Sequence, residues 1–189
     1  MIDEQILVNS DMGIEKLEVV KEALNLSPSG IFLEIGTRAG GTAMMAIKSQ
    51  QSNVVLSVDP YGSKPYIDTN GIAPFVYPDE MYRATLARLS ALALQENKTF
   101  VQFKIPSQEY MSKSLNMWIV GNEVTTHDIK YSYVLLDGEH NDVTVSKEID
   151  FFYDKMQPGG ILLIDNTDWL TLDFSTWHRP RHDMAYKIF

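Results

Sequence analysis

The strongest local signal in the sequence is the stretch Leu-Glu-Ile-Gly-Thr-Arg-Ala-Gly-Gly-Thr, residues 33–42. An apolar run, 31–33, leads into it and a helical pattern continues to about residue 50, which predicts a buried strand, a glycine loop and a helix. Glycines let a backbone turn sharply and approach a ligand closely, and the first turn of a helix offers free N–H groups. The spacing lacks the second glycine of the dinucleotide pattern G-x-G-x-x-G, and a plain strand-to-helix turn would look the same. The candidate ligand-binding residues of this stretch are Glu34, Gly36, Thr37, Arg38, Gly40 and Thr42.

Strands and helices alternate on both sides of this stretch. Near-continuous apolar strands separated by helices are typical of a parallel sheet with helices on both faces. We therefore expect one α/β domain over residues 1–189, because no repeat, low-complexity segment or domain boundary is visible. The other predicted helices are 12–26, 79–95, one from 107, and 143–156 followed by a tight turn at 157–160; the other predicted strands are 53–58, 99–104, 131–136 and 161–164.

Polar residues follow each of the five predicted strands. In an open parallel sheet, ligands bind beyond the carboxyl ends of the strands, where the strand order reverses. Asp59 ends the second strand, a position from which an acid can accept hydrogen bonds from both hydroxyls of a ribose. Without the glycine loop, a turn-forming role before Pro60 would be preferred for this residue. The five groups are Glu34 with Gly36, then Asp59, then Ser107 with Gln108, then Asp137 with His140, and last Asp165 with Asn166.

The last two strand ends form a second cluster of candidate ligands. Asp137, Asp165 and Asn166 offer two carboxylates and an amide oxygen, which are the hard-oxygen ligands that suit Mg²⁺. Capping of turns and of the following helix explains the same residues equally well. His140 lies three residues after Asp137, and the near-neutral pKa of an imidazole suits a general base for a metal-bound hydroxyl. A lone histidine at a helix start is also a common surface or capping residue, so this role depends on the metal.

Bulk properties limit the classes of partner and compartment. The formal net charge is −9, with 25 acidic and 16 basic side chains, so the averaged field repels phosphate backbones and anionic lipids. We expect neither nucleic acid nor membrane as a partner. The acidic N-terminus is unlike a signal peptide, no apolar run could span a bilayer, and cysteine is absent, which together favour a cytoplasmic protein.

These residues resemble those of class I S-adenosylmethionine-dependent O-methyltransferases, in particular the metal-dependent branch that includes catechol and macrolide-sugar methyltransferases. The resemblance runs from about Gly30 to Asn166. It implies a Rossmann-like, mostly parallel seven-stranded sheet with a short C-terminal hairpin, and S-adenosylmethionine as cofactor. The expected partners are a small-molecule acceptor and a second copy of the chain. It assigns the glycine stretch, Asp59, Asp137 and the turn with Ser107 and Gln108 to the cofactor, Asp137, Asp165 and Asn166 to Mg²⁺, and His140 to catalysis.

The sequence departs from the family pattern at both ends. Only residues 167–189 remain to build the hairpin, with 185–189 as a candidate final strand, and the N-terminal extension is short. The aromatic stretch 61–78 is a candidate cover for the ligand. We do not place the tail residues Trp169, Trp177, His178, Arg179, Arg181 and His182 in the site. The competing interpretations are an inactive cofactor-binding or interaction domain, a nicotinamide oxidoreductase, and an iron-dependent hydroxylase.

Overall fold

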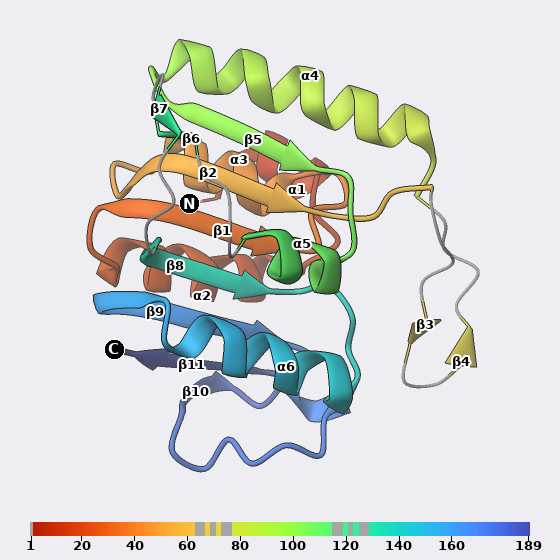
Figure 1. Cartoon of the computed structure of the whole chain (residues 1–189), viewed down its shortest axis with the longest axis vertical. Coiled ribbons are helices and arrows are strands. Elements are labelled where there is room, and N and C mark those ends of the chain that lie inside the picture. Colours follow the sequence, from red (N-terminus) through yellow and green to blue (C-terminus); the bar gives the residue numbers. More distant parts are fainter. Residues whose placement is uncertain are drawn as a thin grey trace.

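A seven-stranded sheet forms the centre of the computed structural model, which describes residues 2–62, 67–68, 71–72, 77–114, 119–120, 123–124 and 129–189 (Figure 1). The strand order is β10-β11-β9-β8-β1-β2-β5; the five strands from β9 to β5 are parallel, and β11 is antiparallel to both β9 and β10. The predicted sheet and C-terminal hairpin are therefore confirmed. The strands of this sheet are β1 Gly30–Ile35, β2 Ser52–Val58, β5 Thr99–Phe103, β8 Tyr131–Leu136, β9 Met156–Asp165, β10 His178–Arg181 and β11 Met184–Ile188. Two short strand pairs lie outside it: β3 Ile67–Asp68 pairs with β4 Gly71–Ile72, and β6 Ile119–Val120 pairs with β7 Glu123–Val124.

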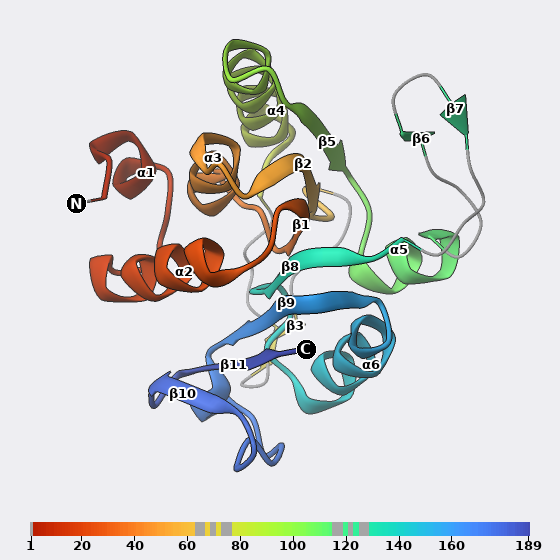
Figure 2. The same ribbon diagram turned by 90° about the vertical axis from the view of Figure 1, so that its left-hand side faces the viewer.

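Helices cover both faces of the sheet and enclose two apolar cores (Figure 2). Successive side chains of a strand point to opposite faces, so Phe32 of β1 packs in one core and Leu33 in the other, both fully buried. Among the described residues, no helix has the length and apolar character needed to cross a membrane. One face carries α1 Glu4–Val8, α2 Ile14–Leu26, α3 Gly41–Lys48 and α4 Asp79–Gln95, the other carries α5 Ser107–Ser114 and α6 Asp142–Tyr153, and a short 3₁₀ turn, η1 Thr167–Trp169, follows β9.

The boundary between α6 and β9 differs from the prediction. Helix α6 ends at Tyr153, and residues 157–160, which we predicted to form a tight turn, lie inside β9. The pairing register between β8 and β9 shifts between Tyr131 and Tyr133, and Gly159 adopts a positive φ of 77°. An irregularity of this kind accommodates glycine and proline within a strand. The prediction was wrong here because Pro-Gly-Gly usually ends an element, whereas the register shift lets β9 continue through it.

Candidate active site

A cleft of about 670 Å³ lies at the carboxyl ends of the parallel strands. It opens around β1, between β2 and β8, where the strand order reverses and open α/β sheets bind their ligands. All five predicted strand ends contribute to its walls. The predicted site residues that line it are Gly36, Thr37, Arg38, Thr42, Asp59, Ser107, Gln108, Asp137, His140, Asp165 and Asn166.

Gly36 occupies the point of closest contact between two strand ends. Its φ is +90°, and a Cβ atom added there would lie 2.0 Å from the carbonyl oxygen of Asp137. The Asp137 N–H donates to the carbonyl of Ile35 at 2.9 Å, which holds the loops after β1 and β8 together. Gly40 also has a positive φ, 78°, but a Cβ there would meet Leu89 of α4 at 2.8 Å. The first glycine therefore shapes the cleft, whereas Gly40 allows the loop to pack on α4.

Asp59 holds the glycine loop in place from the end of β2. Its Oδ2 accepts the N–H groups of Thr37 at 3.0 Å and Arg38 at 2.8 Å, and its Oδ1 accepts the N–H of Tyr61 at 3.1 Å. Burial raises the pKa of the Asp59 carboxyl above its usual value, against the effect of these backbone hydrogen bonds. A carboxylate has about four acceptor positions, so Oδ1 keeps capacity for a ligand hydroxyl. The turn role and the ligand role predicted for Asp59 are thus compatible.

Glu34 lies beneath the loop and does not line the cleft. It is fully buried, and the hydroxyl of Ser57 lies 3.5 Å from its Oε2. Burial, reinforced by the charge of Asp59, raises the pKa of the Glu34 carboxyl well above its usual value. The structure therefore places Glu34 in the interior next to the glycine loop and not among the residues that line the cleft.

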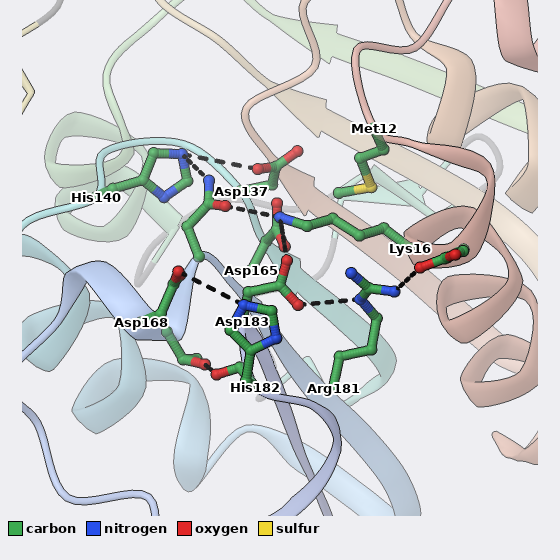
Figure 3. Close-up of polar contacts among 12 residues, drawn as sticks. Met12, Lys16, Asp137, His140, Asp165, Asp168, Arg181, His182 and Asp183 are labelled. Atoms are coloured by element: carbon green, nitrogen blue, oxygen red, sulfur yellow. Dashed lines mark hydrogen bonds and ion pairs between the residues drawn. The ribbon is translucent and has the colours of Figure 1, made fainter.

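A lysine ammonium lies among the residues that were predicted to hold a metal (Figure 3). Lys16 of α2 donates from Nζ to Asp165 Oδ1 at 2.8 Å and to Asn166 Oδ1 at 2.7 Å, and it lies 3.3 Å from Asp183 Oδ2. Burial alone would lower the pKa of Lys16, but the hydrogen bonds and charges of Asp165 and Asp183 outweigh burial and raise it. Sequence analysis missed Lys16, because a lysine on an amphipathic helix carries no local sign of a partner 149 residues away.

His140 lies beside this cluster and lines the cleft. Its Nε2 is 3.2 Å from Asn166 Nδ2 and 3.8 Å from Asp137 Oδ1, and its ring meets Trp169 edge to face at 5.4 Å. Trp169, a tail residue that we did not place in the site, lines the cleft. Because Asn166 Oδ1 accepts from Lys16, the amide nitrogen faces His140 and donates, so that Nε2 is the acceptor. This arrangement gives the imidazole a basic nitrogen on the side of Asn166.

The ligand set for Mg²⁺ does not fit as the residues stand. Burial and the nearby charge of Asp165 raise the pKa of Asp137 well above its usual value, and Lys16 binds Asp165 and Asn166. A divalent cation about 4 Å from an ammonium is repelled by roughly 8 kcal/mol at the effective dielectric of a protein site. Within the part of the chain that the structure describes, no cluster of three or more His, Cys, Asp or Glu side chains could hold a metal ion.

The N-terminal segment forms a wall of the cleft that the sequence did not reveal. The link between α1 and α2, residues 9–13, lines the cleft together with Lys16. The N–H of Gly41 donates to the carbonyl of Asn9 at 3.0 Å, and a Cβ on Gly41 would lie 2.7 Å from the Cβ of Ser10. Gly41 is therefore required by this link. The predicted aromatic cover at 61–78 lies mostly outside the described residues, but Tyr61 and Tyr77 line the cleft.

Residues 33–167 match a family model described as a methyltransferase domain. The fold is similar to CalS11, a calicheamicin methyltransferase, with a TM-score of 0.62 and 14% identity, covering 98% of this chain and 89% of that chain. It is also similar to the O-methyltransferase TomG from Streptomyces achromogenes, involved in tomaymycin synthesis and in complex with SAM (TM-score 0.58, 11% identity, 87% and 66% covered). The fold is similar as well to an O-methyltransferase from Bacillus cereus in complex with SAH. The TM-score is 0.54, the sequence identity is 13%, and the match covers 87% of this chain and 65% of that chain.

The present chain spans slightly less than two thirds of TomG and of the Bacillus cereus enzyme. At these levels of identity the likeness to solved structures concerns the fold alone. No match to a curated protein was found.

Proposed function

The chain belongs to the methyltransferase domain family, and from this premise we propose that it binds S-adenosylmethionine and methylates an oxygen of a small molecule. The observation that carries the proposal is the convergence of five strand ends on one cleft. The glycine loop and Asp59 follow β1 and β2, and His140 follows β8, which pairs with the opposite edge of β1. Fold alone does not imply activity, so the residues of the cleft must support each part of the proposal.

The cofactor side of the cleft has the features that S-adenosylmethionine requires. Gly36 lets the loops after β1 and β8 meet closely at the cleft, and Asp59 Oδ1 retains acceptor capacity for a ribose hydroxyl. Ser107 and Gln108, at the start of α5, would face the adenine. When bound, S-adenosylmethionine supplies an electrophilic methyl: the acceptor oxygen forms the new C–O bond, the C–S bond breaks, and its electron pair remains on sulfur.

The other side of the cleft supplies a proton acceptor and a positive charge. Under the proposal, the acceptor hydroxyl replaces Asn166 Nδ2 as the hydrogen-bond donor to His140 Nε2, and this nitrogen takes the hydroxyl proton as the new bond forms. The ammonium of Lys16, which lines the cleft, offsets negative charge that develops on the acceptor oxygen. Mg²⁺ assistance, expected from the resemblance, stays a prediction, and the position of Lys16 argues against it.

Titration calorimetry with S-adenosylhomocysteine tests the cofactor half of this proposal. We expect micromolar binding by the wild type and a roughly ten- to hundredfold weaker affinity for Asp59→Asn, because a charge-assisted hydrogen bond contributes about 1.5–3 kcal/mol. Asp150→Asn is the matched control, since Asp150 is exposed on α6 and does not line the cleft. Its affinity should equal that of the wild type.

Absence of binding by the wild type would refute the proposed function. Equal affinities of the wild type and Asp59→Asn would retain a cofactor site but remove Asp59 from it. Binding without methyl transfer to any tested catechol or sugar diol would favour the alternative of an inactive cofactor-binding domain.

A further inference from the structure

The acceptor side of the cleft already contains a cation, the ammonium of Lys16 (Figure 3). We infer that this ammonium takes the place of a divalent metal, so that the methyl transfer proposed above, on which this inference rests, proceeds without one. Asp165 and Asn166 are two of the three predicted metal ligands, and their side-chain oxygens lie 2.8 and 2.7 Å from Lys16 Nζ. The positive charge is thus supplied by the chain itself.

The surrounding charges hold Lys16 in this position. Asp183 Oδ2 lies 3.3 Å from the ammonium, and Asp183 Oδ1 accepts a hydrogen bond from Arg181 Nε at 3.0 Å. Arg181 in turn pairs with Glu15, the residue next to Lys16 on α2. Charges therefore alternate from the surface to the cleft through Glu15, Arg181, Asp183, Lys16 and Asp165.

Burial distinguishes Lys16 from a surface lysine in a chance contact. Its side chain is 16% exposed, and that of Asp165 is 4% exposed. Helix α2 packs against β9, the strand that ends at Asp165, so the helix and the acid are fixed relative to each other. A buried carboxylate requires a partner charge, and here Lys16 provides that charge.

Lys16 also contacts Asn166, the residue beside His140. The ammonium takes the amide oxygen of Asn166, which turns the amide nitrogen toward His140 Nε2 at 3.2 Å. An amide nitrogen can only donate, so this contact requires an unprotonated Nε2. Lys16 therefore fixes the orientation of the Asn166 amide beside His140.

Binding of Mn²⁺ tests the inference without requiring turnover. We expect the wild type to leave the electron paramagnetic resonance signal of free Mn²⁺ almost unchanged at about millimolar concentrations, whereas Lys16→Met should bind Mn²⁺ at least about tenfold more tightly. Removing the ammonium frees Asp165 and Asn166 beside Asp137. Lys16→Arg keeps the charge and should behave as the wild type does. Lys21→Met removes a lysine of the same helix that does not line the cleft, and it should also gain no binding.

A double variant shows where the gained ion binds. Lys16→Met/Asp165→Asn lacks both the ammonium and one carboxylate ligand, so it should lose the Mn²⁺ affinity that Lys16→Met gains. Mn²⁺ binding by the wild type that matches Lys16→Met would overturn the inference. If Lys16→Met does not fold, the wild type and Lys16→Arg still decide, because tight binding by either contradicts it.

The S-adenosylhomocysteine titration keeps the two proposals apart. Failure of the wild type to bind it refutes the proposed function and leaves the Mn²⁺ comparison readable. Conversely, wild-type binding of both S-adenosylhomocysteine and Mn²⁺ retains the proposed function and refutes the role of Lys16 as the resident cation.

Discussion

Gly36→Ala should lower the melting temperature by roughly 10 °C and abolish detectable binding of S-adenosylhomocysteine. A non-glycine residue in the left-handed region costs about 1–2 kcal/mol, and Gly36 has a φ of +90°. The new Cβ would lie 2.0 Å from the Asp137 carbonyl oxygen, and moving a packed backbone away typically costs about 1–3 kcal/mol more. For a chain of this size, about 1 kcal/mol corresponds to roughly 2–4 °C. The loops after β1 and β8 would separate, and both line the cleft.

Gly13→Ala is the matched control for this prediction. Gly13 also lines the cleft, but its φ of −62° suits any residue and no atom lies within 4 Å of a Cβ built there. Differential scanning calorimetry should find Gly13→Ala within about 2 °C of the wild type. A melting temperature of Gly36→Ala within the same range of the wild type would mean that the tight contact between Gly36 and Asp137 does not determine the stability of the fold.

The strand ends were predictable because their place follows from a rule of topology. Apolar runs located β1, β2, β5, β8 and the second half of β9, and a parallel sheet brings all their carboxyl ends to one edge. Asp59, Asp137 and Asp165 could therefore be grouped before their distances were known. The position of a residue at a strand end follows mainly from the topology of the sheet. These three residues therefore line one cleft, as expected.

The parts that escaped prediction depend on contacts between distant segments. Lys16 reaches Asp165 because α2 packs on β9, and nothing within α2 encodes that partner. Helix α1 has only five residues, too few to produce a clear apolar period, yet the link after it packs on Gly41. The ammonium of Lys16 changes the interpretation of the predicted metal ligands, so the type of cation was the least predictable feature of the site.

Glu148→Gln should change how the free energy of unfolding depends on pH. Glu148, on α6, is 1% exposed, and burial raises the pKa of its carboxyl to about 8, with Ser107 opposing and Glu139 adding to the shift. Between about pH 4.5 and pH 8 the folded protein keeps a proton that the unfolded chain releases, so this group's contribution to stability falls as pH rises. Each pH unit of that window costs about 1.4 kcal/mol, which amounts to at most about 5 kcal/mol. Glutamine does not titrate and should remove this loss.

Urea unfolding at about pH 5 and about pH 8.5 measures the effect. The difference in unfolding free energy between Glu148→Gln and the wild type should shift by roughly 3–5 kcal/mol in favour of the variant at the higher pH. Glu22→Gln removes an exposed carboxyl of α2. The difference in unfolding free energy between this variant and the wild type should not change with pH. A flat difference for Glu148→Gln as well would mean that Glu148 is ionised in the folded protein across this range. Glu148 lies beside Ser107, which lines the cleft. An ionised Glu148 would therefore also place a negative charge behind the proposed adenine site.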